Sequence, residues 1–279
     1  MDRNRDFSWN KVPAVGLLFW LAKLISTGMG ESVSDASNRI FKSYFGGNLV
    51  IGALFTMAWS VGLFLFFLIK QRRAERYQPV YYWGAVALLA VFGTVVADSA
   101  TAVIGVPIIV LVGLTGLVMG ICFYLWYRAT KNLSIHQIRS SKSEAYYWIT
   151  VAVSFALGTL MGDWMGDAAT FELGLGYLNA GLILTGIFLV LLAYRLIGRP
   201  RENGIMEILS FWLAYVLTRP IGASFSDYFS YRWNHGVLGS KEMSLIFIIL
   251  FALVLAVVMV QFYREKQLIT KYSAENKIG

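Results

Sequence analysis

The chain has 279 residues, of which 57% are hydrophobic and only 14% are charged, and its mean hydropathy is +0.61. Soluble domains carry nearly twice this share of charged residues. Apolar runs of about twenty residues recur along the whole sequence, and each is long enough to cross roughly 30 Å of hydrocarbon as a helix. The composition therefore excludes a soluble globular protein and predicts a single membrane domain over residues 1–279.

The net charge of +8 is distributed in a way that indicates topology rather than nucleic-acid binding. Lys and Arg gather in the connections after every second apolar run, at 70–76, 128–142 and 195–201, and again in the C-terminal tail. Such a bias follows the positive-inside rule, so we expect these loops and both termini to be cytoplasmic. We expect no nucleic-acid partner.

Eight apolar segments predict eight transmembrane helices. In chain order they cover residues 12–34, 49–69, 80–100, 104–127, 145–166, 176–193, 208–226 and 245–262. The first contains no small-residue cleavage site, so we do not interpret it as a signal peptide. The single cysteine, Cys122, excludes a disulfide within the chain, and the two histidines, His136 and His235, fall in predicted loops. Metal sites built from Cys and His are therefore not expected.

A fourfold internal repeat organises these segments. Tryptophans lie 63, 65 and 64 residues apart, and each is followed by a glycine at position +10 and an aspartate at +15. The tryptophans are Trp20, Trp83, Trp148 and Trp212; the glycines are Gly30, Gly93, Gly158 and Gly222; the aspartates are Asp35, Asp98, Asp163 and Asp227. The repeat predicts four units at residues 12–76, 77–139, 144–201 and 206–264.

Each unit contains two predicted helices, so all four units enter the membrane in the same orientation. The expected fold is therefore an all-α integral membrane protein of eight transmembrane helices, built as four parallel tandem hairpins in a pseudo-fourfold ring or in two pairs. Fifteen helical residues span roughly 22 Å. With each Trp near the cytoplasmic interface, as an anchor or a packing residue, the four aspartates should share one depth toward the outer end.

A polar stripe accompanies the aspartates on the odd-numbered helices, at positions +3, +7, +11 and +15 from each Trp. Its acids, with Asp167 one turn beyond, are Glu31, Asp35, Asp98, Asp163, Asp167 and Asp227. Its bases are Lys23 and Arg219, and neutral oxygen ligands nearby are Thr27, Thr94, Thr159 and Ser224. The even-numbered helices are nearly free of ionisable residues, so we expect them to face lipid and the stripe to point inward.

Two interpretations of the stripe stay open. In the first, the six acids bind a hard divalent cation such as Mn²⁺ or Mg²⁺, or a proton, because oxygen-rich sets suit such ions. Lys23 and Arg219 would then tune affinity. In the second, the aspartates cap turns or pair with bases and only hold the units together. An intramembrane aspartyl protease is disfavoured, because Leu160 and Trp164 replace the first glycine of its Gly-x-Gly-Asp motif. We expect no enzymatic activity.

Several stretches of this sequence resemble a known bacterial family. They are Lys11-Val12-Pro13, Phe19-Trp20, Gly30-Glu31, Phe92-Gly93-Thr94 with Asp98, Leu133-Ser134-Ile135-His136, Ala145-Tyr146-Tyr147-Trp148, Gly158-Thr159 and Thr218-Arg219-Pro220-Ile221-Gly222-Ala223-Ser224. Through them the chain resembles the uncharacterised membrane-anchored proteins, which contain four tandem copies of a two-helix repeat with a characteristic tryptophan. The resemblance implies a bacterial inner-membrane location and brings no settled activity.

The expected function is therefore a multi-pass transporter or channel for an inorganic cation, with proton coupling as an option. The alternative is a non-transporting scaffold or sensor that binds a partner or lipid through its basic face. The expected partners are the lipid bilayer, the cation or proton and, in a homo-oligomer, further copies of the chain. A bound divalent cation is the one cofactor that the acids suggest.

Overall fold

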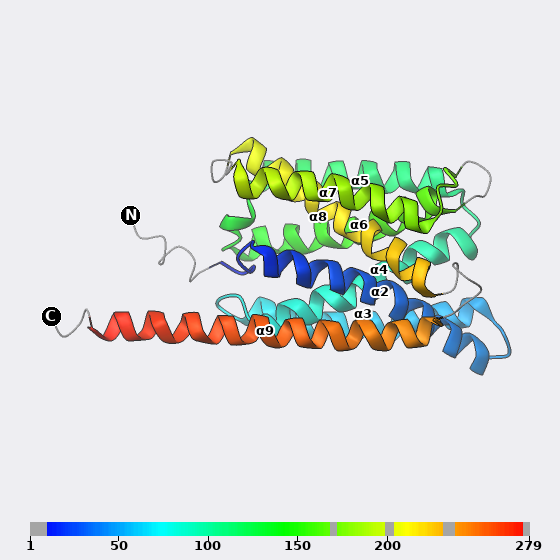
Figure 1. Ribbon diagram of the computed structural model, residues 1–279, viewed down its shortest axis with the longest axis horizontal. Helices are drawn as coiled ribbons and strands as arrows, with labels where there is room; N and C mark the ends of the chain where they lie inside the picture. The colour runs from blue at the N-terminus through cyan, green and yellow to red at the C-terminus, as the bar shows by residue number, and fades with distance from the viewer. Residues whose placement is uncertain (1–9, 168–171, 199–203, 231–237, 276–279) are drawn as a thin grey trace.

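A computed structural model describes residues 10–167, 172–198, 204–230 and 238–275 (Figure 1). These residues form eight α-helices and one short 3-10 helix. The helices are α2 (Leu17–Tyr44), α3 (Leu49–Arg73), α4 (Pro79–Ala102), α5 (Ile108–Thr130), η1 (Ile135–Gln137), α6 (Ser141–Gly166), α7 (Tyr177–Ile197), α8 (Ile205–Ser230) and α9 (Ser240–Glu275). The predicted all-α fold is confirmed.

Seven of the helices in the described ranges are long and apolar enough to cross a membrane. The eighth, α2, has 28 residues but carries Lys23, Glu31, Asp35 and further charged residues, so its composition alone does not identify it as a span. It nevertheless runs through the bundle beside the others (Figure 1). The chain is a multi-pass, all-α membrane protein. Helix α2 buries Lys23 and Glu31 against the other inner helices, which is how charged side chains are accommodated inside a membrane domain.

Local signals explain where several helices begin and end. The Asn48 side chain accepts a hydrogen bond from the backbone N–H of Ile51 at the start of α3, and Ser140 forms a capping box with Ser143 at the start of α6. Helix α2 begins later than predicted, after Gly16, and continues well past Asp35. It ends only near Gly46 and Gly47, whose positive φ values of 63° and 87° leave the helical region.

The first helices of the four units form a closed inner ring. Helix α2 packs against α4, α4 against α6, α6 against α8, and α8 against α2. The second helices lie outside this ring, and each packs mainly against the inner helix of the next unit: α3 on α4, α5 on α6, α7 on α8, and α9 back on α2. Of the two predicted arrangements, the structure adopts the pseudo-fourfold ring.

Burial separates the two sets of helices as the sequence predicted. More than half of the apolar window of α4, α6 and α8 is buried inside the protein, but less than a quarter of that of α3, α5, α7 and α9. The outer helices expose large apolar side chains such as Leu54, Leu117, Val190 and Leu253. Such a surface is stable against lipid tails, and charged residues occur only near the ends of the outer helices.

The glycine at +10 sets the spacing of the inner ring. A Cβ added to Gly30 would lie 2.3 Å from the Cβ of Ala90, and one added to Gly222 would lie 2.2 Å from the Thr27 hydroxyl oxygen. Likewise, Gly93 meets Phe155 on α6, and Gly158 meets Arg219 on α8. In every unit this glycine therefore faces the +7 residue of the next inner helix, which allows close backbone approach.

The repeat tryptophans pack inside the bundle and are no more than 5% exposed. Three of them meet a phenylalanine of an outer helix: Trp20 contacts Phe188, Trp148 contacts Phe64 and Trp212 contacts Phe123, with ring centroids 5.1–6.3 Å apart. Their role as interfacial anchors is therefore not supported. The packing alternative holds, because each ring fills a groove between inner and outer helices.

Polar contacts join the segments at the basic end of the bundle, where the described chain starts and α9 ends (Figure 1). The backbone N–H of Lys11 donates to the carbonyl of Ile138, and the Lys11 ammonium pairs with Glu144 at 3.0 Å. Farther round the ring, Glu207 pairs with Arg195 at 3.0 Å. These contacts tie the start of the chain and the loops of different units together at one end.

Candidate functional site

The polar stripe lies on the axis of the inner ring and forms successive layers. We name four of them from the basic end: the lysine layer is Lys23, Val86, Val151 and Tyr215; the arginine layer is Thr27, Ala90, Phe155 and Arg219; the threonine layer is Glu31, Thr94, Thr159 and Ala223; the aspartate layer is Asp35, Asp98, Asp163 and Asp227. All residues of the first three layers are at most 3% exposed. The prediction that the stripe points inward is confirmed.

The aspartate layer and Glu31 bring five carboxylates together at one end of the axis. Asp98 lies close enough to Glu31, Asp163 and Asp35 for their charges to interact, and Asp227 interacts with the same three groups and with Asp98. Ligand oxygens of Glu31, Asp35 and Asp98 all lie within 4.8 Å of one another. Opposite ligands of a single Mg²⁺ or Ca²⁺ ion are about 4–5 Å apart, so these three carboxylates fit around one hard cation.

Arg219 closes the axis directly below the carboxylates. Its guanidinium pairs with Glu31 at 2.8 Å and donates to the hydroxyl of Thr159, also at 2.8 Å. It also donates to the Thr94 hydroxyl and, at 2.7 Å, to the backbone carbonyl of Thr27. One side chain of α8 thus contacts α2, α4 and α6. Because a guanidinium presents several donors in a fixed plane, arginine suits such a junction.

Lys23 lies one layer farther from the carboxylates and is 1% exposed. Its ammonium nitrogen is 3.8 Å from the ring centroid of Phe155 and 4.1 Å from that of Tyr215. Among the described residues it forms no ion pair. Of the two bases, Arg219 therefore pairs with an acid, as the structural interpretation of the stripe requires, whereas the Lys23 ammonium lies against aromatic faces.

The basic half of the axis contains a further layer that sequence reasoning missed. The aromatic layer consists of the residues just before each repeat tryptophan, Phe19, Tyr82, Tyr147 and Phe211, all at most 3% exposed. The Tyr82 and Tyr147 hydroxyls form a hydrogen bond between the neighbouring helices α4 and α6. In the sequence, Tyr-Tyr pairs at 81–82 and 146–147 directly precede two of the repeat tryptophans, a composition that is typical of a membrane-interface belt. Applying the four-residue period backward from Lys23 would have placed Tyr82 and Tyr147 inside the ring.

Three predicted site residues take other positions or contacts. Asp167 follows the last residue of α6 and accepts a hydrogen bond from the Tyr177 hydroxyl at 2.6 Å, and it is not among the carboxylates whose charges act on Asp98 and Asp227. The Thr27 hydroxyl donates to the carbonyls of Leu24 and Thr218, at 2.7 and 2.9 Å, so it links α2 to α8. The Ser224 hydroxyl is buried without a hydrogen-bond partner among the described residues. Asp167 thus lies outside the geometric cluster.

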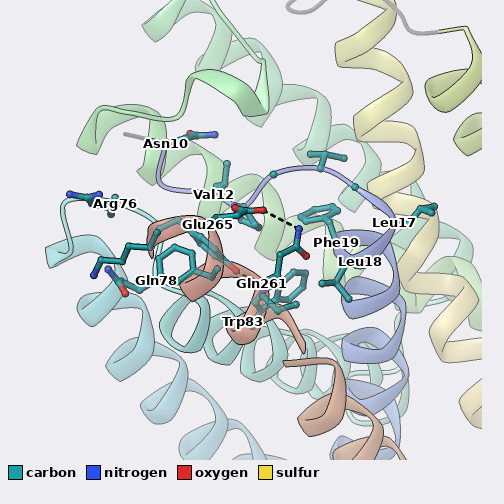
Figure 2. A pocket seen from close by; sticks show the side chains of 18 residues that line it. Asn10, Val12, Leu17, Leu18, Phe19, Arg76, Gln78, Trp83, Gln261 and Glu265 are labelled. Carbon is teal, nitrogen blue, oxygen red and sulfur yellow. Dashed lines mark hydrogen bonds between the residues drawn. The ribbon is translucent and has the colours of Figure 1, made fainter. Parts of the chain in front are cut away.

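A cavity of about 550 Å³ opens at the basic end, between the start of α2, the start of α4 and the C-terminal half of α9 (Figure 2). Trp83 and Phe262 contribute apolar surface, and Gln261 donates to Glu265 at 3.1 Å beside them. Tyr77 also lines it. Burial raises the pKa of Tyr77 above its usual range, and the nearby Glu265 carboxylate adds to the shift.

Comparison with known proteins identifies the repeat but supplies no activity. The family model described as Repeat of Unknown Function (DUF347) matches residues 18–77, 146–199 and 210–266. No curated protein and no solved structure matches the chain. The matched ranges contain the first, third and fourth tryptophans and all of the clustered carboxylates except Asp98.

Proposed function

Because the chain belongs to the Repeat of Unknown Function family, whose description names no activity, we propose from the site alone that it is a carrier for a hard inorganic cation, Mn²⁺ or Mg²⁺. The observation that carries this proposal is the convergence of Glu31, Asp35 and Asp98 within 4.8 Å at one end of the axis. Gathering carboxylates inside a membrane protein is unfavourable unless a cation or protons offset their repulsion.

The layers below the carboxylates favour a carrier over an open channel. Arg219, Lys23 and Phe155 occupy the axis between the aspartate layer and the basic end, and all three are buried. A cation at the carboxylates therefore meets two positive charges and an aromatic ring before it could leave in that direction. Transport then requires a rearrangement of the inner ring, as in alternating access.

We place the carrier in a bacterial inner membrane, with the basic end and both termini cytoplasmic. The positive-inside rule supports this orientation, because Arg72, Arg128 and Arg195 lie near that end of α3, α5 and α7. The five carboxylates would then collect the cation from the periplasmic side or release it there.

The test is cation flux in proteoliposomes that contain the purified protein. The double substitution Asp98→Asn, Asp163→Asn is expected to lower Mn²⁺ or Mg²⁺ flux by at least about tenfold, because two of the five negative charges are lost. Glu242→Gln is a matched control, since Glu242 is an exposed carboxylate in the first turn of α9. Unchanged flux in a double variant that elutes as a folded protein would reject the carrier.

The alternative of a non-transporting scaffold is favoured by one observation, the extent of the Arg219 network. A guanidinium that joins four inner helices is what a purely structural role requires. A thermal-shift series in detergent with Mn²⁺, Mg²⁺, Ca²⁺ and Na⁺ separates the two functions. A higher unfolding temperature with a divalent ion alone supports the carrier, whereas the same unfolding temperature with all four ions supports the scaffold.

A further inference from the structure

We infer that Lys23 exchanges a proton when a cation binds, and that Tyr215, Tyr147 and Tyr82 conduct this proton toward the basic end. The inference rests on the proposed cation carrier and deepens it, because it names the residues that couple transport to protons. Neither Lys23 nor the tyrosines belong to the carboxylate set that would bind the cation.

Lys23 is surrounded by aromatic and apolar side chains and by a second base. On α8 it faces Tyr215 and Arg219, and on α6 it faces Phe155 and, in its own layer, Val151. On α4 its layer contributes only Val86. Within its own helix the nearest acid is Glu31, two turns away and paired with Arg219. The charged neighbour of Lys23 is therefore another cation, and burial makes the charged ammonium costly.

Lys23 and Arg219 share the Phe155 ring. The ammonium nitrogen of Lys23 lies 3.8 Å from its centroid, and the guanidinium carbon of Arg219 lies 5.7 Å from it. A divalent cation that binds Glu31 must share this carboxylate with Arg219. The positive charge near Lys23 then rises, which favours release of its proton. By reciprocity, protonation of Lys23 weakens cation binding.

A series of buried tyrosine hydroxyls leads away from Lys23. The Tyr215 hydroxyl is fully buried and has no hydrogen-bond partner among the described residues, although Tyr147 lies close enough to interact with it. Tyr147 is hydrogen-bonded to Tyr82. The Tyr82 ring contacts Tyr77 at 5.5 Å between centroids, and Tyr77 lines the cavity at the basic end.

The proton balance along this route is simple. The flexible stem of Lys23 allows its ammonium to move from the face of the Tyr215 ring to the hydroxyl oxygen. The ammonium gives one proton to that oxygen, and Tyr215 passes its own O–H proton to Tyr147, which passes one to Tyr82. Tyr82 in turn passes one proton to Tyr77, and Tyr77 releases its own O–H proton to solvent in the cavity at the basic end. A neutral amine then remains at Lys23, and each tyrosine ends with one proton.

Proton release by Lys23 is tested at equilibrium. Mn²⁺ is added to the purified protein in weakly buffered detergent, and a pH indicator counts the protons released. Lys23→Met is expected to bind Mn²⁺ and to release about one proton fewer per ion than the unchanged protein. Lys23→Arg, which keeps a permanent charge, should also release about one proton fewer per ion. It should bind Mn²⁺ about tenfold more weakly. If either folded variant binds Mn²⁺ and releases the original number of protons, the inference is wrong.

The two proposals fail in different ways in this experiment. If the unchanged protein binds no Mn²⁺, Mg²⁺ or Ca²⁺, the cation carrier itself is rejected. If it binds the ion and the Lys23 variants do not alter the proton count, only the assignment of Lys23 is rejected.

The tyrosine route is tested by measuring the rate of proton movement. In proteoliposomes, the pair Tyr82→Phe, Tyr147→Phe removes two hydroxyls and is expected to slow cation-driven proton movement by at least about tenfold without changing the proton count at equilibrium. The matched control is Tyr81→Phe, Tyr146→Phe, since these neighbours are only half-buried and precede the axial tyrosines by one residue. Equal rates for the two pairs would remove the tyrosine route.

Discussion

Arg219→Met is expected to destabilise the protein by about 3–5 kcal/mol, the usual cost of breaking a buried ion pair by removing one partner. The substitution leaves the Glu31 carboxylate without its cation and removes the donors to Thr94, Thr159 and the Thr27 carbonyl. Because these acceptors lie on three other helices, the loss affects the whole inner ring. Chemical or thermal unfolding in detergent, followed by circular dichroism, measures it.

Two further variants separate the ion pair from the loss of packing. The double variant Glu31→Gln, Arg219→Met contains no unpaired charge at this position and should recover part of the stability. Arg72→Met, at an exposed arginine that donates to Ser141, should cost less than about 1 kcal/mol. If Arg219→Met also lowers the free energy of unfolding by less than about 1 kcal/mol, the Arg219 network does not hold the inner ring together.

Gly222→Ala is expected to be the second most damaging single change, at about 1–3 kcal/mol for an overpacked contact. The new methyl group would lie 2.2 Å from the Thr27 hydroxyl and 2.6 Å from the backbone nitrogen of Gly28. A hydroxyl can rotate away, but the backbone of α2 cannot move without opening its contacts with α8. The unfolding midpoint of the purified variant measures the effect.

An equivalent glycine on an outer helix provides the control. A Cβ added to Gly116, in the middle of α5, meets no atom within 4 Å. Gly116→Ala should therefore be neutral or stabilise the helix by about 0.5–1 kcal/mol, because alanine has the higher helix propensity. Similar losses for Gly116→Ala and Gly222→Ala would show that the close approach of the inner helices is not what the repeat glycine provides.

The four units share a scaffold, but only the aspartate layer has the same residue in every unit. The threonine layer has Glu31, two threonines and Ala223, and the arginine layer contains one arginine. A symmetric ring thus carries an asymmetric site, in which one cation, Arg219, faces one extra acid, Glu31. In a ring this close-packed, a second arginine in the same layer would have no space and no partner.

The sequence by itself determined the repeat, the all-α membrane fold and the depth of the acids. These properties depend on hydrophobic length and helical period, which are local, and a fixed Trp-to-Asp interval gives a fixed rise along each helix. It also determined which face points inward, since a charged stripe cannot face lipid. Inner and outer helices could be told apart for the same reason.

Only the tertiary structure decided which helices are neighbours, and with it the partners of individual side chains. Ring closure by α2 and α8 brings Arg219 to Glu31, residues 188 positions apart, and leaves Lys23 between two aromatic rings. It also buries Tyr82 and Tyr147 on the axis, while Asp167, at the end of α6, binds Tyr177 instead. Hydropathy specifies that a polar helix face must be enclosed by protein. It does not specify which residues enclose that face, because these come from packing between segments distant in sequence.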